Sequence, residues 1–457
     1  MAIDTTIAAI STPPGTGAVS MVRVSGPDAF TICDRIFKKK KPFSFCEAEK
    51  NTVHYGRITE LESGVVLDEV VAAVYRAPHS FTGEDTVEIF CHGGVTVTRR
   101  VLMEIIRAGA SQAEAGEFSK RAFLNGKLDL SQAEAIIELI NARTYAAETL
   151  AARSLSGGAG QTIKDIRAGL IDVLSHILAY IDFPDEDVEY IDEDEVLRLI
   201  RDAQSRIEKL ISTYKSGRAI TEGIDCAIVG RTNAGKSSVM NRLTGEETSI
   251  VTDIEGTTRD VVSKSVSVGR AVLNLLDTAG IREARDAVER IGVERALSAL
   301  DRAQLVLYVA DTSDPRGADD EIIGRIKDKP VIVVLNKSDL SPAAPEDEYA
   351  ALGDVVRISA KTGEGLSQLK QKIEDMFIDR GLDPARDDII TAERHFERLT
   401  RASEALSEAT QGLAAGMTFD VVSIDIQAAA DALGDVTGQS AADEVIDRIF
   451  ERFCIGK

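Results

Sequence analysis

The chain has 457 residues, enough for about three domains of roughly 150 residues each, and 44% of them are hydrophobic, so a sizeable core can form. Its formal net charge is −22, which is unusual for a protein that holds nucleic acid alone, because phosphate neutralisation supplies most of that affinity. It has no run of ~20 apolar residues, no basic secretory leader and no CxxC pair among its five cysteines, so we expect a cytoplasmic protein without membrane attachment or a disulfide framework.

The first part of the chain is rich in short β-branched runs. The segments "AVSMVRVSG", "VVAAVYRAP" and "DTVEIFCHGG" each end near Gly or Pro, which is typical of strands. A helix is expected over residues 95–108, so residues 1–122 are predicted to form an α+β domain. From about residue 131 onwards, apolar residues recur every three or four positions, which predicts a helical segment over residues 123–217.

Strands and helices alternate after residue 217. The apolar runs "IDCAIV", "AVLNLLD", "LVLYVAD", "VIVVLN" and "VVRIS" are separated by helical stretches, which indicates a sheet buried on both faces over residues 218–379. Helical sequence returns over residues 380–457. Because neither helical segment is large enough to bury a core well by itself, we predict one all-α domain built from both segments, with the α/β domain inserted into it.

A phosphate-binding motif follows the first strand of the α/β domain. The segment "GRTNAGKSS" fits GxxxxGK[ST] between a strand and a helical stretch. Gly230 and Gly235 let backbone amides wrap the phosphates, and Lys236 can reach the β- and γ-phosphates. The Ser237 hydroxyl can coordinate Mg²⁺. The motif therefore predicts a P-loop nucleotide site.

Three further motifs indicate that the nucleotide is GTP or GDP. In "DTAG", Asp277 can hold Mg²⁺ through water and the Gly280 amide can sense the γ-phosphate. In "NKSD", Asp339 can accept two hydrogen bonds from guanine, a donor pair that adenine lacks. The segment "SAK" at 359–361 can complete the base pocket. Each motif lies at the end of a predicted strand, which is the arrangement of a Ras-like P-loop GTPase domain.

The catalytic residues differ from those of Ras at one position. A Ras-like protein places Gln directly after DxxG to orient the attacking water, whereas this chain has Ile281 there. Two other groups are available. Asn233 could hold a monovalent cation beside the phosphates, and Glu289 could reach a water. For Glu289, a solvated helix face is the alternative interpretation.

The chain as a whole resembles one family. The segments "TPPGTGAVSMVRVSG", "SFTGEDTVEIFCHGG", "GEFSKRAFLNGKLDLSQAEAI", "IDFPDED", "TDIEGTTRD", "DTAGIREA" and "FCIGK" are similar to the tRNA-modification GTPases called MnmE or TrmE. The resemblance implies an N-terminal folate-binding domain and a homodimer. It also implies an FAD-containing partner, MnmG or GidA, in a heterotetramer or larger assembly. Together they would add an aminomethyl or carboxymethylaminomethyl group to C5 of the wobble uridine of certain tRNAs, using 5-formyl- or 5,10-methylenetetrahydrofolate.

The resemblance also assigns roles to individual residues. Glu289 would be the catalytic glutamate, and Thr258 would join Ser237 on Mg²⁺. K⁺ would be held by Asn233, Thr252, Ile254 and Thr257. The folate would be bound by Arg23, Glu88, Lys127 and Lys457. The residues expected to line the nucleotide site are Asn233, Ala234, Gly235, Lys236, Ser237, Ser238, Thr252, Asp253, Ile254, Glu255, Gly256, Thr257, Thr258, Asp277, Thr278, Ala279, Gly280, Asn336, Lys337, Ser338, Asp339, Ser359, Ala360 and Lys361. One departure is Thr232, where proline is commoner, so the loop is expected to be slightly less rigid.

Cys454 lies near the C-terminus and has three interpretations. Gly456 and Lys457 do not match a prenylation motif, which argues against a lipid anchor. If Lys457 lines the folate site, Cys454 lies near it, and its thiol could act catalytically, as a nucleophile in its thiolate form or as a proton donor in its neutral form. The alternative is a small buried cysteine that packs the C-terminal helix.

A second functional class shares the GTPase motifs. A ribosome-assembly or RNA-chaperone switch would bind RNA and hydrolyse GTP without modification chemistry. Such a switch would not need the folate-domain motifs or the terminal cysteine, which is why the modification enzyme is the preferred prediction.

Overall fold

The computed structural model describes residues 5–182, 192–231, 233–245, 262–276, 300–314, 320–342, 344 and 346–457. The chain divides into two compact units, Met1–Ile137 with Asp431–Lys457, and Glu138–Ala430. Within the described residues, no helix is both long enough and apolar enough to cross a membrane.

The first unit is built on a seven-stranded sheet with the order β3-β4-β5-β6-β2-β1-β7, in which only the β1–β7 pair is parallel. Its strands are β1 (Ile7–Ile10), β2 (Val19–Ser25), β3 (Phe37–Lys38), β4 (Thr52–Thr59), β5 (Val66–Tyr75), β6 (Thr86–His92) and β7 (Ser111–Gln112). Its helices are α1 (Ala29–Ile36), α2 (Val95–Arg107), α3 (Glu117–Leu124) and α15 (Asp443–Phe450), and α4 (Leu130–Asn141) begins in it. The helix expected over 95–108 is therefore confirmed as α2.

One face of this sheet carries the core of the first unit. Val22, Val24 and Ile89 are fully buried there against α1 and α2, because alternate residues of a strand point to the same face. The opposite face is more open. Val53 and Tyr55 of β4 are 67% and 62% exposed on it. The sheet therefore has one covered face and one face available to ligands or partners.

The second unit joins long helices to a six-stranded sheet. Its helices are α5 (Tyr145–Leu155), α6 (Gly158–Asp182), α7 (Glu193–Thr221), α8 (Lys236–Thr244), α10 (Asp320–Ile326), α11 (Glu346–Ala350), α12 (Leu366–Phe377) and α13 (Glu393–Ala414), and most of α14 (Phe419–Thr437). Its strands are β8 (Ile224–Val229), β9 (Val262–Val268), β10 (Ala271–Leu276), β11 (Leu305–Asp311), β12 (Val331–Asn336) and β13 (Asp354–Arg357).

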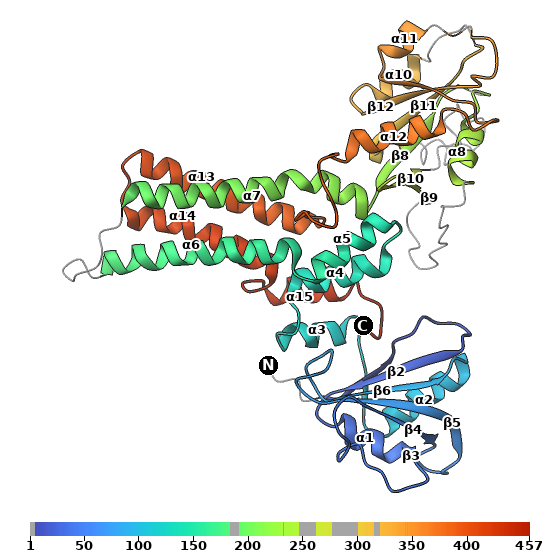
Figure 1. The fold of residues 1–457 in the computed structure, drawn as a ribbon, viewed down its shortest axis with the longest axis vertical. Coiled ribbons are helices and arrows are strands. Elements are labelled where there is room, and N and C mark those ends of the chain that lie inside the picture. The colour runs from blue at the N-terminus through green and yellow to red at the C-terminus, as the bar shows by residue number, and fades with distance from the viewer. Residues whose placement is uncertain are drawn as a thin grey trace, which may run out of the picture. The chain divides into compact units, whose positions relative to one another are not determined.

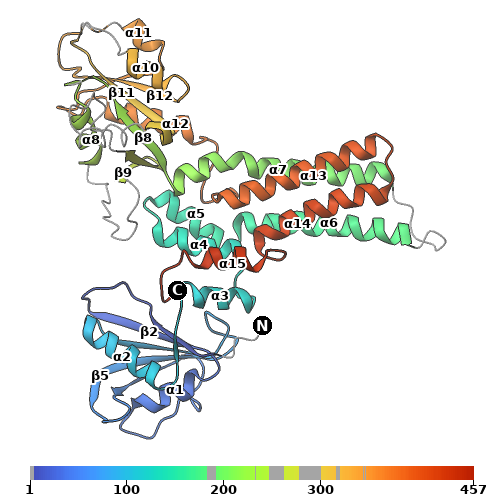
Figure 2. The ribbon, with the colours of Figure 1, turned by 180° about the vertical axis from the view of Figure 1, so that it is seen from behind.

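The long helices come from two distant parts of the sequence. Helices α6 and α7 precede the six-stranded sheet, whereas α13 and α14 follow it, and they lie side by side in both views (Figure 1, Figure 2). Tyr214 of α7 and Phe396 of α13 stack with ring centroids 4.5 Å apart. This confirms a helical domain built from two segments with an α/β domain inserted. The domain limits predicted from sequence stay predictions, and α7 continues through Gly217 to Thr221.

The six-stranded sheet has the order β13-β12-β11-β8-β10-β9 and is parallel except for β9. All six residues of β12 are buried, as expected for a strand covered on both faces. The parallel direction brings the carboxyl ends of β8, β11 and β12 to one edge, where Val229, Asp311 and Asn336 end their strands. The predicted nucleotide motifs follow these strand ends.

Candidate functional site

The phosphate loop connects β8 to α8 and packs closely against β11 and β12. Gly230 has φ +139°, and a Cβ there would lie 2.1 Å from the Val309 carbonyl oxygen of β11. Gly235 has φ +97°, and a Cβ there would lie 2.1 Å from Asn336 Nδ2. Only glycine tolerates both the backbone conformation and the close approach. The two motif glycines are therefore required by the packing of the loop as well as by its fit to phosphates.

The lysine and serines of the motif form the first turn of α8, next to the phosphate loop. Lys236 donates from Nζ to the carbonyl oxygens of Gly230 at 2.8 Å and Arg231 at 2.9 Å, so its ammonium group lies over the loop. Ser237 and Ser238 are exposed in the first turn of α8, where the helix N-terminus favours anions. A Mg²⁺ ion at Ser237 fits this arrangement, because the hydroxyl group is accessible and hard oxygen ligands suit that ion.

Asn336 links three motifs that are far apart in the sequence. Its Nδ2 donates to the Ala234 carbonyl oxygen of the phosphate loop at 3.0 Å, and its Oδ1 accepts from the Ala360 amide at 3.0 Å. The Asn336 side chain is buried, with 2% of the residue exposed. "NKSD", "SAK" and the phosphate loop are thereby joined into a single site, as the sequence predicted for neighbouring strand ends.

The base-recognition carboxylate is held in an exposed position. Asp339 Oδ1 accepts from Ser359 Oγ at 2.7 Å, and the Ser338 amide donates to the Ile358 carbonyl oxygen at 3.0 Å. The hydrogen bond from Ser359 lowers the pKa of Asp339, and the charges of Lys361 and Lys337 act in the same direction. The carboxylate is therefore ionised at neutral pH and can accept two hydrogen bonds from a guanine edge.

Asp311 belongs to this site but escaped the sequence prediction. Its Oδ2 lies 2.5 Å from Lys337 Nζ, and its Oδ1 accepts from the Ser313 amide at 2.9 Å and from Ser313 Oγ at 2.7 Å. Burial raises the pKa of Asp311, but the hydrogen bonds from Lys337 and Ser313 outweigh it and the pKa is lowered. The signal available in the sequence was its place at the end of the apolar run "LVLYVAD".

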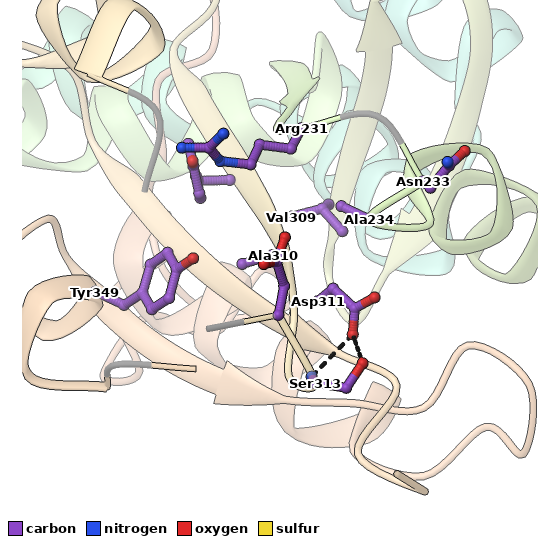
Figure 3. A pocket seen from close by; sticks show the side chains of 10 residues that line it. Arg231, Asn233, Ala234, Val309, Ala310, Asp311, Ser313 and Tyr349 are labelled. Carbon is purple, nitrogen blue, oxygen red and sulfur yellow. Dashed lines mark hydrogen bonds between the residues drawn. The ribbon is translucent and has the colours of Figure 1, made fainter. Parts of the chain in front are cut away.

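A cavity of about 430 Å³ lies beside the phosphate loop. Figure 3 shows the bonds from Ser313 to Asp311 on its wall, together with Arg231 and Asn233 of the loop. Asn233 is exposed and has φ +65°. Its amide oxygen is therefore accessible for the predicted K⁺. The cavity is lined by Arg231, Asn233, Ala234, Tyr308, Val309, Ala310, Asp311, Ser313, Asp314 and Tyr349.

Several predicted site residues lie outside the described residues. They include Glu289, predicted to activate water, and Ile281, the position after DxxG. The others are Thr232, Thr252, Asp253, Ile254, Glu255, Gly256, Thr257, Thr258, Asp277, Thr278, Ala279 and Gly280. Their roles stay predictions.

A second cluster lies on the open face of the N-terminal sheet. Arg23 Nε donates to Glu88 Oε1 at 3.0 Å, and each side chain is only 13% exposed. The Arg23 guanidinium lies over the rings of Phe81 and Phe118, 5.1 Å and 5.5 Å from their centroids. The register pairs Arg23 with Glu88, Glu88 with Ala73, and Ala73 with Val53, which places the pair on the same face as exposed Val53.

The two other predicted folate residues contact the segments that hold this pair. Lys127 Nζ donates to the Pro78 carbonyl oxygen at 3.0 Å, on the loop that leads to Phe81. The Lys457 carbonyl oxygen accepts from the Phe118 amide at 3.2 Å. The segments that carry Phe81 and Phe118 thus each contact a lysine that is predicted to bind folate. The structure brings Arg23 and Glu88 into direct contact, whereas Lys127 and Lys457 contact only the segments that carry the two rings.

The C-terminal segment is docked onto the N-terminal sheet. Ile455 forms a β-bridge with Ala115, and Gly456 is buried with φ +96°. A Cβ at Gly456 would lie 2.2 Å from the Ile10 carbonyl oxygen, so glycine is required for the docking. Cys454 is exposed, which contradicts the alternative in which it is a buried packing residue. The docked neighbours fix the backbone, while the thiol faces solvent.

The strand order, the phosphate loop and the Asn336 contacts define a P-loop GTP-binding domain inserted in a helical domain. A family model described as the MnmE helical domain matches residues 130–454, and one described as the GTP-binding protein TrmE N-terminus matches residues 6–127. The chain belongs to the MnmE family of tRNA modification GTPases.

Relatives with that name match the full length of the chain. The tRNA modification GTPase MnmE of Acetivibrio thermocellus is 42% identical over 458 residues, covering 99% of each chain. That of Listeria welshimeri is 44% identical over 457 residues, again covering 99% of each. The solved G domain of the T. maritima FeoB iron transporter is 26% identical, covers 33% of this chain and 97% of that one, and has a TM-score of 0.25. The family assignment rests on the full-length relatives.

Proposed function

We propose that this tRNA modification GTPase uses potassium for GTP hydrolysis and binds a tetrahydrofolate derivative in its N-terminal domain. It acts as a cytoplasmic homodimer with an FAD-containing partner to add an aminomethyl-type group to the wobble uridine of tRNA. When bound, the folate supplies the one-carbon unit. The partner provides much of the tRNA contact, which is consistent with the net charge of −22 on this chain.

The observation that carries the proposal is the Arg23–Glu88 cluster, a second site far from the nucleotide motifs in sequence. An ion pair on the open sheet face, with both side chains 13% exposed and the guanidinium over two aromatic rings, offers a flat ligand both hydrogen bonds and ring contacts. Glu88 can accept from the amine and amide edge of a pterin. Lys127 and Lys457 can pair with the anionic glutamate tail. A GTPase switch without modification chemistry needs no such cluster.

The open sheet face also supports a homodimer. Val53 and Tyr55 are exposed on the same face as the ion pair, and Val19 is 58% exposed. A second copy covering this face would bury these apolar side chains and would enclose the folate cluster at the same time. The dimer and the folate site are therefore proposed on one face of the sheet.

Calorimetry with 5-formyltetrahydrofolate tests the proposal through Glu88→Ala. Loss of a charge-assisted hydrogen bond costs about 1.5–3 kcal/mol, so affinity should fall roughly 10- to 100-fold. Glu60→Ala is the matched control, because Glu60 forms an ion pair with Arg100 of α2, the helix on the covered side of the sheet, away from the proposed dimer face. The control should bind like the parent. Equal affinity of Glu88→Ala and the parent would place the folate elsewhere.

The exposed thiol of Cys454 leads to a prediction about the modification step. Cys454→Ser and Cys454→Ala should both fold, hydrolyse GTP and bind folate, because the side chain contributes no buried packing. If the thiolate is the reacting group, the modified wobble uridine measured in tRNA from cells carrying either variant should fall at least about tenfold. Cys46→Ala is the control, since Cys46 is an exposed cysteine in the same unit. Parental modification in both Cys454 variants would rule out a chemical role.

A further inference from the structure

Helix α5 of the helical domain contributes to the hydrophobic core of the GTPase sheet. Ala147 and Leu150 are 2% and 1% exposed, and they belong to the same apolar cluster as Val266 of β9 and Leu273 of β10. In both views α5 lies next to this end of the sheet (Figure 1, Figure 2). Helix α5 therefore shares one apolar core with the strand pair β9–β10.

A chain of hydrogen bonds accompanies this packing. Arg143, in the connection between α4 and α5, donates from Nη1 to Ser265 Oγ of β9 at 2.7 Å. Ser265 Oγ donates to Asn274 Oδ1 of β10 at 2.9 Å. Asn274 Nδ2 then donates to the Glu222 carbonyl oxygen at 3.0 Å, directly after α7. The chain begins and ends in the helical domain and passes through both strands between.

The strands β9 and β10 each adjoin a motif of the GTP site in the sequence. Strand β10 leads directly into "DTAG", and β9 follows the "TDIEGTT" segment, so the strand pair connects two motifs of the GTP site. The Asn274 side chain also packs closely against the backbone of Gly223, because a Cβ at Gly223 would lie 3.0 Å from Asn274 Nδ2. A shift of α5 relative to the sheet would change these hydrogen bonds. Because coupling is reciprocal, a shift of the strands would also displace α5.

We propose that Arg143 is a positioning residue for GTP hydrolysis. From the helical domain it holds Ser265, and through Ser265 it holds Asn274, which fixes the strand pair that leads into the GTP site. Its cationic donor polarises the Ser265 hydroxyl and strengthens the bond to Asn274. The same contact transmits the nucleotide state to α5. The contact does not touch the phosphate loop or the base pocket, so we expect the affinity for GDP to depend little on it.

Turnover of GTP by full-length variants tests this role. Arg143→Ala and Ser265→Ala should each lower kcat about three- to tenfold, while the Kd for a fluorescent GDP analogue stays within about twofold. The double variant should be no slower than Ser265→Ala, because both changes break one chain. Arg143→Lys should regain part of the rate. Ser267→Ala is the control, since Ser267 is half-buried on the same strand and face.

Hydrogen exchange provides a second test, in which the first comparison uses the parent protein alone and does not depend on variant folding. Amides of α5 should exchange at different rates with GDP and with GDP–aluminium fluoride, and Ser265→Ala should remove the difference. Identical exchange of α5 in the two nucleotide states would overturn the proposal. So would a parental kcat in Arg143→Ala, or single-variant losses that multiply in the double variant.

Discussion

Asp339→Asn is expected to weaken GTP binding and to create binding of xanthosine triphosphate. The Asp339 carboxylate is exposed, ionised and oriented by Ser359, so it can accept from both guanine donors. An amide presents one donor and one acceptor instead, which matches the edge of xanthine. Two charge-assisted hydrogen bonds at about 1.5–3 kcal/mol each predict a loss of roughly 10²- to 10⁴-fold in GTP affinity.

Fluorescence titration with both nucleotides measures this reversal. Asp354→Asn is a suitable control, because Asp354 is an exposed carboxylate on β13 of the same sheet and forms an ion pair with Lys372. The control should keep the parental preference for GTP. If Asp339→Asn bound GTP as tightly as the parent does, guanine recognition would have to be assigned to another group.

The phosphate loop and its neighbouring strand ends could be predicted from sequence because their information is local. Each motif directly follows a strongly apolar run, and parallel strands bring their carboxyl ends to the same edge. Gly230 and Gly235 mark backbone conformations that few other residues adopt, so their spacing identifies a phosphate loop before any tertiary contact is known. The order of the strands was not needed for that inference.

Contacts between distant segments could not be predicted in the same way. The Asp311–Lys337 pair depends on β11 and β12 being neighbours, and the bond from Arg143 to Ser265 depends on where α5 packs. Ordinary polar residues form these contacts, so no motif marks them. Cys454 illustrates the opposite problem. Its small side chain allowed a buried role, and only the folded chain shows that Cys454 is exposed while Ile455 and Gly456 beside it are docked.

Hydrolysis of GTP is expected to depend on potassium and on Glu289. With Ile281 in place of the Ras glutamine, the site needs another source of positive charge and another group to orient water. A K⁺ ion held by the accessible amide oxygen of Asn233 would provide the charge that an arginine finger provides elsewhere, which is worth roughly 10³–10⁵ in rate. Turnover in NaCl should therefore be at least about tenfold slower than in KCl, because the smaller Na⁺ fits the same ligands less well.

Two variants separate the cation from the water-activating group. Asn233→Ala should lower turnover in KCl to the level seen in NaCl, since the variant has lost a ligand of the cation. Glu289→Ala should lose nearly all turnover in either salt, about 10²-fold or more, and should still bind a fluorescent GDP analogue like the parent. Glu283→Ala is the control for Glu289, because it removes a carboxylate from the same "IREARDAVERIG" segment. If Glu289→Ala retained parental turnover, its carboxylate would be a solvated surface group. Equal rates of the parent in KCl and NaCl would exclude potassium from the mechanism, whatever the two variants do.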